Sequence, residues 1–466
     1  MAFDDRGEGA ERSSASMSST VAALLILDLV ACAAWMAYRF RVHRNPSLLG
    51  LTFLFALIRY GVMAVPYSRD PQLPFPIPAT YPLFLAATFT CYVFGATVAS
   101  WVMQFDMHAA QRRFFEQPAE QRSSVALPVF GAIFLATAVV GVYFVTATEH
   151  TGLEMLINYG GEQRILRTFS EEFGAANPYA YAGTVINWVI GPMLIMVASN
   201  LWRSNRRLAW AAAAAAVFVL LVFTSTASLS KAPIIMVMLY ILTNGFLSKW
   251  DGGKIKPRAI AIPVAVMLAL GTLGYALTYG KSIGDALDDT ISRIFVVPLV
   301  SVHGFLYVYP NVVPFANGMG IGLVARMFDV PNFVTPDAIV GTLASGPNTC
   351  FDSIWTTDLW ANFGWAGVFV GGAFVGALLL FLDRWCLMRK RTAVTVALYA
   401  FMLVSSTQLT EASIFTMLLS GGLATAPILA WLLEIESRKL PTGATPVGAK
   451  RGPWQRRKIA PESTLS

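Results

Sequence analysis

Residues 359–382 have the sequence LWANFGWAGVFVGGAFVGALLLFL, and none of them carries a charge. A helix needs about 20 predominantly apolar residues to cross the hydrocarbon core of a bilayer. This stretch meets that length without an ionisable side chain, whereas an apolar run in a soluble core is usually shorter. It therefore predicts a transmembrane helix.

The rest of the chain has the same character. Of its 466 residues, 56% are hydrophobic and 13% are charged, whereas soluble domains carry roughly 25% charged residues. A chain so poor in charge cannot cover a water-facing surface with polar groups, so lipid must be its solvent over much of its length. We predict an all-α polytopic integral membrane protein with about eleven transmembrane helices. The expected spans are roughly 19–38, 47–66, 77–103, 125–147, 180–201, 208–227, 232–248, 259–279, 359–382, 393–410 and 412–433.

Lysine and arginine are distributed unevenly among the segments that join these spans. Cytoplasmic segments of membrane proteins are enriched in both residue types. With the N-terminus outside, every predicted inner segment holds more Lys and Arg than either neighbouring outer segment. We therefore expect an outside N-terminus and an inside C-terminus. The net charge of +7 reflects these topology signals, and we expect no nucleic acid partner.

The expected organisation is one transmembrane helical domain, residues 19–435, between two polar tails. Residues 1–18 form a polar N-terminal tail, and residues 436–466 form a basic, disordered tail on the cytoplasmic side. Two outer loops, about 148–179 and 280–358, exceed the roughly 12–15 residues of an ordinary connection. Their aromatic and apolar residues argue against disorder, so we expect these loops to be functional.

The larger outer loop contains an apolar stretch from Phe295 to Tyr309. Pro298, His303 and Gly304 interrupt this stretch, which is also shorter than a membrane span. Irregular backbone at membrane depth is tolerated where protein covers it. We therefore expect a re-entrant or interfacial helix here.

The chain lacks three common signatures of catalysis and metal binding. It has no GxxxxGK[ST] phosphate loop, no HExxH and no CxxC. Its four histidines, His43, His108, His150 and His303, are divided between inner and outer segments and cannot share one site. We expect neither a metal ion nor a cofactor.

Arg59, in the sequence LIRYG, falls in the middle of a predicted span. An arginine at the centre of a bilayer costs about 2.5–3.5 kcal/mol on insertion scales, so it must face protein or water. It either binds an anionic group or pairs with a carboxylate of another helix. Glu411, in QLTEAS, lies in a tight outer turn and is a candidate catalytic base or arginine partner. Asp358 is a further acidic candidate.

Other candidate residues also belong to the predicted outer side. Arg164 and Arg167 lie one turn apart in GGEQRILRT, Lys231 lies in the short turn of STASLSKAP, and Arg293 precedes the apolar stretch. These cations suit the binding of a diphosphate, although a solvated helix face or a snorkelling lysine would look the same. His303 is a candidate general base, and the alternative is a solvated interfacial histidine.

Two segments resemble bacterial oligosaccharide repeat-unit polymerases of the Wzy type. TSTASLSKAPIIMVMLY, residues 224–240, resembles their turn of small polar residues followed by a basic residue, with Lys231 where those proteins usually have arginine. Residues 345–379 resemble their segment after the large outer loop. There an NFG-x-x-G turn, here Asn362–Gly364 and Gly367, leads into a glycine-rich span.

This resemblance implies an all-helical membrane glycosyltransferase fold shared with O-antigen ligases. It implies polymerisation of repeat units on an undecaprenyl-diphosphate carrier at the outer face of the bacterial inner membrane. We then expect Arg293, Lys231, Arg164, Arg167 and Arg59 to bind the diphosphate. His303 or Glu411 would accept the proton of the acceptor hydroxyl. The implied partners are the carrier-linked oligosaccharide, membrane lipid, and flippase and chain-length regulator proteins.

Three alternatives remain open at this level. An O-antigen ligase-like enzyme would use the same donor with a different acceptor. A transporter or flippase of lipid-linked glycan would need a cation-lined path to the inner face, and charge within the predicted spans is sparse. A non-catalytic assembly partner would tolerate loss of the outer charges.

Overall fold

The computed structural model describes most of the chain as helices. The described residues are 19–42, 46–62, 75, 78–117, 125, 127–147, 180–228, 232–250, 257–330, 333–346, 350–351 and 354–434. Within these ranges every regular element is a helix. The predicted tails 1–18 and 436–466 and the whole of the loop 148–179 lie outside the described residues.

The helices follow one another along the chain as α1 (Ser19–Trp35), η1 (Met36–Phe40), α2 (Leu48–Ala56), η2 (Leu57–Val62), α4 (Tyr81–Val102), α5 (Met107–Glu116), α6 (Leu127–Thr146), α9 (Ala180–Val185), η4 (Ile186–Ile190), α10 (Gly191–Asn205), α11 (Leu208–Ser228), α12 (Ala232–Lys249), α13 (Pro257–Tyr279), α14 (Ile283–Val308), α15 (Gly322–Met327), α16 (Pro336–Ser345), α17 (Trp355–Leu387), α18 (Ala393–Thr407), η5 (Gln408–Thr410), α19 (Ile414–Leu419) and α20 (Thr425–Glu434).

Each predicted span overlaps a helix of the structure. Within the described ranges, eight helices are long and apolar enough to cross a membrane: Thr20–Phe40, Tyr81–Val102, Leu127–Thr146, Tyr181–Asn205, Leu208–Ser225, Ile283–Val308, Trp355–Leu387 and Ala393–Thr410. Shorter apolar helices cover Leu48–Val62, Ile235–Lys249, Val264–Leu277 and Thr425–Glu434. The prediction of a helical polytopic membrane protein is confirmed at this level.

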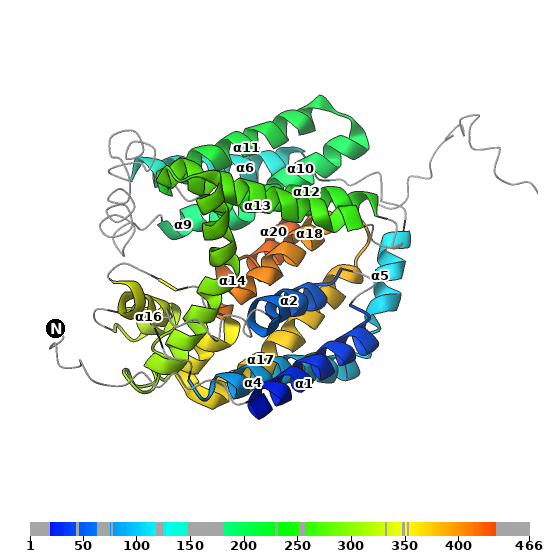
Figure 1. Cartoon of the computed structure of the whole chain (residues 1–466). Coiled ribbons are helices and arrows are strands. Elements are labelled where there is room, and N and C mark those ends of the chain that lie inside the picture. The colour runs from blue at the N-terminus through cyan, green and yellow to red at the C-terminus, as the bar shows by residue number, and fades with distance from the viewer. Residues whose placement is uncertain are drawn as a thin grey trace, which may run out of the picture.

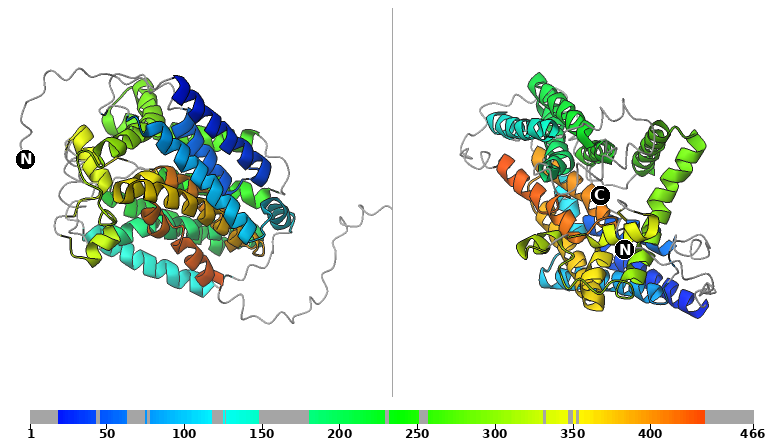
Figure 2. Two further views of the ribbon diagram at one scale, coloured as in Figure 1. Left: turned by 90° about the horizontal axis from the view of Figure 1, so that it is seen from below. Right: turned by 90° about the vertical axis from the view of Figure 1, so that its left-hand side faces the viewer.

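Most of the long helices share one direction, and α14 crosses it. In Figure 1, α4, α12, α13 and α17 run along a common axis, whereas α14 runs across that axis and connects the region of α13 to that of α16. The left-hand view of Figure 2 shows α1 beside α4, and Trp35 Nε1 of α1 donates a hydrogen bond to Thr97 of α4 (3.0 Å). The helices of the bundle are thus held together by polar as well as apolar contacts.

Helix α14 is longer and more regular than its sequence suggests. It begins after Ser282, whose hydroxyl accepts a hydrogen bond from the backbone N–H of Asp285, and it continues through Pro298, His303 and Gly304. The expected interruption at these residues is therefore wrong. Surrounding helices can satisfy the backbone groups that an internal proline frees, so the helix continues past Pro298.

Glycines bring α17 and α4 into close contact. A Cβ atom on Gly376 would lie 2.0 Å from the carbonyl oxygen of Tyr92, and one on Gly95 would lie 1.9 Å from that of Ala373. A side chain at either position would overlap the backbone of the other helix. The glycines therefore permit the close packing, as small residues do in many membrane bundles. The glycine-rich span thus packs closely against α4.

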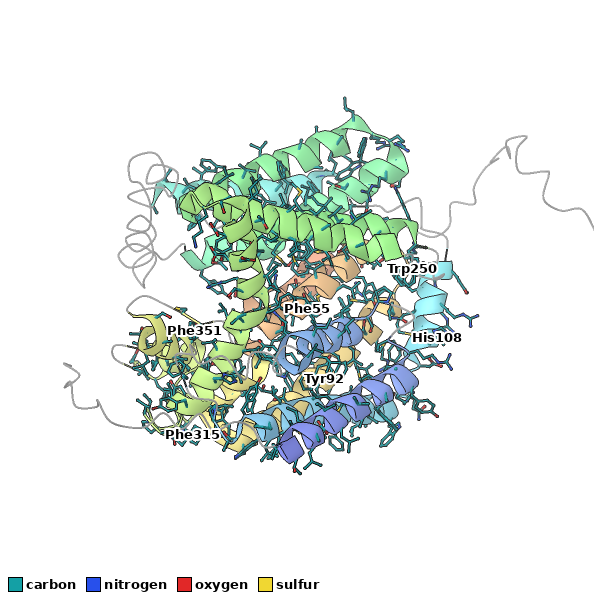
Figure 3. All side chains as sticks on the ribbon, viewed as in Figure 1. Phe55, Tyr92, His108, Trp250, Phe315 and Phe351 are labelled. Carbon is teal, nitrogen blue, oxygen red and sulfur yellow. The ribbon has the colours of Figure 1, made fainter. Side chains whose placement is uncertain are left out.

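Gly364 reverses the chain within α17. Its φ of +59° is unfavourable for residues with a side chain. Leu359 then lies against Gly367, where a Cβ would be 2.2 Å from the Leu359 carbonyl oxygen. Residues 355–363 therefore fold back along the rest of α17. Trp355, at the start of this segment, packs on Tyr92 with ring centres 5.6 Å apart, and Figure 3 labels Tyr92 within the bundle.

The reversal frees carbonyl groups that a preceding loop then binds. The carbonyl oxygens of Ala361 and Asn362 accept hydrogen bonds from the N–H groups of Ala316 and Asn317, at 2.9 Å each. This fold-back lies inside the predicted loop–span junction. It is C-terminal to the stretch in which the sequence suggested a re-entrant helix.

The last predicted span is also broken. Helices α19 and α20 replace the single helix expected over residues 412–433, with a turn at Gly422, whose φ is +91°. A Cβ there would lie 2.5 Å from the Phe401 ring. The local conformation and the close approach of α18 both require glycine, and the helix ends before it.

Helix α2, whose continuation η2 carries Arg59, is anchored at its beginning. The carboxylate of Asp383 on α17 accepts hydrogen bonds from the N–H groups of Leu48 and Leu49, at 3.1 Å each, and from the Tyr399 hydroxyl at 3.1 Å. The first N–H groups of a helix have no partner within the helix and favour an anion. Asp383 therefore fixes the start of α2.

Candidate functional site at the Arg59–Glu411 ion pair

Arg59 is buried near the end of the short helix formed by α2 and η2. Its side chain is 1% exposed, and its guanidinium carbon lies 5.1 Å from the centre of the Phe55 ring, which Figure 3 labels on the same helix. The described helix ends at Val62, so Arg59 lies close to its end rather than in its middle. Arg59 also lies in a π-helical turn, a form that is frequent at functional sites.

The guanidinium of Arg59 contacts two other parts of the chain. Its Nε donates a hydrogen bond to the carbonyl oxygen of Ile294 on α14 (2.7 Å), and its Nη1 donates to the Thr410 hydroxyl (3.0 Å). Its Nη2 lies 2.6 Å from Oε1 of Glu411. Arg59 therefore joins η2, α14 and the turn after α18, and its charge is balanced by Glu411.

The two partners of this ion pair differ in exposure. The Arg59 side chain is enclosed, whereas that of Glu411 is 41% exposed. The sequence left open whether Arg59 binds an anion or pairs with a carboxylate of another helix, and the second arrangement is the one present. Glu411 is therefore the member of the pair that solvent reaches, and Arg59 is the member that the surrounding helices enclose.

His303 lies in a second part of the same region. Its ring packs on that of Tyr81 with centres 4.4 Å apart, and Tyr81 lies close enough to Tyr60 for an electrostatic interaction. The Tyr60 hydroxyl in turn donates a hydrogen bond to the carbonyl oxygen of Thr410. His303 is 3% exposed, and its ring nitrogens have no hydrogen-bond partner in the part of the chain that the structure describes.

Arg293 and His303 lie on the same helix but at different ends of this region. Arg293 is exposed and directly precedes Ile294, whose carbonyl group binds Arg59. At a rise of about 1.5 Å per residue, His303 is about 15 Å further along α14. The structure therefore brings the backbone at Arg293 close to Arg59 and Glu411, while His303 joins them only through Tyr81 and Tyr60.

The turn that carries Glu411 also reaches a second acidic group. Ser413 forms a hydrogen bond with the buried Asp358, which also interacts with the charge of Asp337 on α16. Burial, with smaller contributions from these two carboxylates, raises the pKa of Tyr309 to about 12. The segment from Thr410 to Ser413 thus lies between a buried cation and a pair of carboxylates.

Three of the predicted diphosphate-binding residues, Arg164, Arg167 and Lys231, lie outside the described residues. Within the described ranges, no group of three or more His, Cys, Asp or Glu side chains has the arrangement of a metal site.

Several residues of the site were not expected from the sequence. Tyr60 and Thr410 are adjacent in the chain to Arg59 and Glu411, and this adjacency is the only signal that could have suggested them. The carbonyl group of Ile294 leaves no signal at all, because any residue could supply it.

No family model, curated protein or solved structure matches this chain. The geometry of the site and the resemblance of the two sequence segments are therefore the basis for assigning a function.

Proposed function

We propose that this protein polymerises undecaprenyl-diphosphate-linked oligosaccharide repeat units into a surface polysaccharide or exopolysaccharide at the outer face of the bacterial inner membrane. The observation that carries the proposal is the buried Arg59 guanidinium in a helical membrane bundle, whose counter-charge is the half-exposed Glu411. A fixed arginine beside an exposed part of such a bundle suits a lipid-linked diphosphate.

The proposed reaction transfers a glycan between two carriers. A sugar hydroxyl of the acceptor attacks the anomeric carbon of the donor, a new glycosidic bond forms, and the bond from that carbon to the diphosphate breaks. The lipid diphosphate leaves with its negative charge, and a base accepts the proton of the hydroxyl. Fixed cations that meet the charge developing on the leaving group lower the barrier without having to reorganise.

The residues of the site have different roles in this proposal. Arg59 and the neighbouring Arg293 bind the diphosphate, and Arg164, Arg167 and Lys231 remain candidates for the same role. Glu411 is 41% exposed and can meet an acceptor hydroxyl, whereas the ring of His303 is only 3% exposed. Glu411 is therefore the more accessible candidate base.

The arrangement of the ends of the bundle supports an outer location for this site. Phe315 and Phe351 lie at one end in Figure 3, on the side of α14 and α16, and His108 and Trp250 lie at the opposite end. The second end holds α5 with its exposed Arg112 and Arg113, and arginine is enriched on the cytoplasmic side. We propose that the end with α14 and α16 faces outward.

The test is the polysaccharide size profile of a deletion strain complemented with wild type, Arg59→Lys or Arg389→Lys. Arg389 pairs with Glu434 at 3.1 Å away from the site and serves as the matched control. Lysine cannot form the planar fork of arginine, so we expect Arg59→Lys to reduce polymer at least about tenfold and Arg389→Lys to restore the full ladder.

Other results would indicate a different function for the protein. Long polymer in the deletion strain would overturn the polymerase function. Normal polymer that is no longer attached to its acceptor lipid would instead identify an O-antigen ligase-like enzyme. Repeat units retained at the inner face would point to transport of lipid-linked glycan.

A further inference from the structure

We infer that Glu411 is a displaceable counter-ion, and that the Arg59 guanidinium beneath it is a binding site for the diphosphate group of a lipid. The inference rests on the proposed function only for the nature of the lipid. The exchange of one anion for another at Arg59 follows from contacts and exposure alone.

The cation of this site is held in place without Glu411. Ile294 and Thr410 accept hydrogen bonds from Nε and Nη1 of Arg59, and the Phe55 ring lies 5.1 Å from its guanidinium carbon. These contacts orient the guanidinium so that Nη2 faces Glu411. When Glu411 leaves, Arg59 keeps this orientation and offers Nη2 to the incoming anion.

The anion of this site is held much less firmly. Glu411 follows the single turn η5 and precedes α19, and its side chain is 41% exposed. A partly exposed carboxylate keeps much of its hydration, so Glu411 itself loses little when another anion replaces it at Arg59. A buried arginine without a counter-charge is strongly unfavourable. The site therefore requires an anion but does not require this one.

A diphosphate supplies the negative charge and the hydrogen-bond acceptors that Glu411 gives to Arg59, and it supplies more of both. It brings more negative charge than one carboxylate, and its oxygens can accept two parallel hydrogen bonds from a guanidinium. The membrane location suits a carrier whose hydrocarbon tail remains among the helices. A lipid diphosphate should therefore compete with Glu411 better than a free anion does.

If Glu411 competes with the ligand for Arg59, removing its charge should increase the affinity for an anion. Glu411→Gln keeps the shape of the side chain but removes the competing charge, so an anion should bind more tightly. If Glu411 instead helped to hold the ligand, the same change would weaken binding. If Glu411 acted only as a base, the change would lower turnover and leave binding unaltered.

The experiment is calorimetric titration of the full-length protein in detergent with farnesyl diphosphate, inorganic pyrophosphate and farnesol. We expect Glu411→Gln to lower the Kd for farnesyl diphosphate up to about fivefold, in keeping with the modest strength of partly exposed ion pairs. The matched control is Glu434→Gln, which removes the carboxylate of the Arg389 pair and should leave the Kd unchanged. Arg59→Lys, with its folding checked by thermal unfolding, should raise the Kd.

The three ligands separate the sources of the diphosphate. Farnesyl diphosphate binding more tightly than pyrophosphate, with farnesol weakest, supports a lipid diphosphate. Equal binding of pyrophosphate and farnesyl diphosphate overturns the lipid part of the inference. An unchanged or higher Kd in Glu411→Gln, or an unchanged Kd in Arg59→Lys, overturns the displaceable counter-ion. None of these measurements needs polymer synthesis, so loss of the polymerase function would be recognised separately.

Discussion

At the scale of single residues, the burial of Arg59 determines what its surroundings must contain. A charge enclosed among helices needs both an anion and hydrogen-bond acceptors, and Glu411, Thr410 and Ile294 supply them. The sequence predicted that Arg59 would face protein or a polar cavity, because a lipid-facing arginine is too costly. It named Glu411 as a candidate arginine partner but did not say which arginine it would meet, since hydropathy carries no information on which distant segments lie together.

Tyr309 provides a prediction on pH dependence. Its pKa of about 12 in the folded protein exceeds the ordinary value of about 10, because burial favours the neutral phenol. This preference stabilises the fold fully below about pH 10, and the stabilisation is lost as the pH rises toward 12. We expect the melting temperature of Tyr309→Phe to fall less than that of wild type between pH 10 and 12.

The control for this prediction is Tyr38→Phe, because the Tyr38 side chain is exposed. Thermal unfolding followed by circular dichroism at several pH values measures the difference. An equal alkaline loss in wild type and Tyr309→Phe would show that the Tyr309 phenol does not contribute to it.

At the scale of elements, the contact between α4 and α17 depends on glycine. A Cβ on Gly376 would meet the Tyr92 carbonyl oxygen at 2.0 Å, and backbone cannot move aside as a flexible side chain can. We expect Gly376→Ala to destabilise the protein by about 1–3 kcal/mol, the usual range for overpacking. In contrast, Gly131→Ala on the exposed face of α6 meets no atom within 4 Å and should be neutral or slightly stabilising. Urea unfolding measures the free energy of unfolding of the two variants. Equal values would show that the stability of the protein does not depend on the close approach of α4 and α17 at Gly376.

The helices also show which features of the fold hydropathy can predict and which it cannot. Apolar length predicted a helix in every expected span, because the bilayer requires one. It did not predict that residues 355–363 fold back on α17, since that reversal depends on Gly364 and on hydrogen bonds from Ala316 and Asn317. Nor did it predict the unbroken course of α14 through Pro298, which depends on the helices around it.

At the scale of the whole molecule, Arg391 ties the end opposite the candidate site together. Its guanidinium donates hydrogen bonds to the carbonyl oxygens of Phe115 (2.7 Å), Leu247 (3.1 Å) and Trp250 (2.9 Å). These carbonyl groups belong to the C-terminal ends of α5 and α12 and the residue after α12, where backbone acceptors lack helical partners. One side chain thus connects three segments of the bundle.

The orientation of the molecule can be tested by thiol labelling in intact cells. Met327, the last residue of α15, is 73% exposed, and the Arg112 side chain on α5 is 60% exposed. In a variant without the native cysteines, we expect a membrane-impermeant maleimide to label Met327→Cys in intact cells. It should label Arg112→Cys only after the cells are permeabilised. The reverse pattern would place the candidate site on the cytoplasmic side and remove the proposed outer-face reaction.

The helix that carries Arg59 is fastened at both ends, and this has a mechanical consequence. Asp383 holds its first N–H groups, while Ile294 and Thr410 hold the guanidinium near its last turn. These contacts limit the movement of the helix at both places. We therefore expect that a ligand replacing Glu411 at Arg59 would move the Glu411 side chain and leave the position of the helix unchanged.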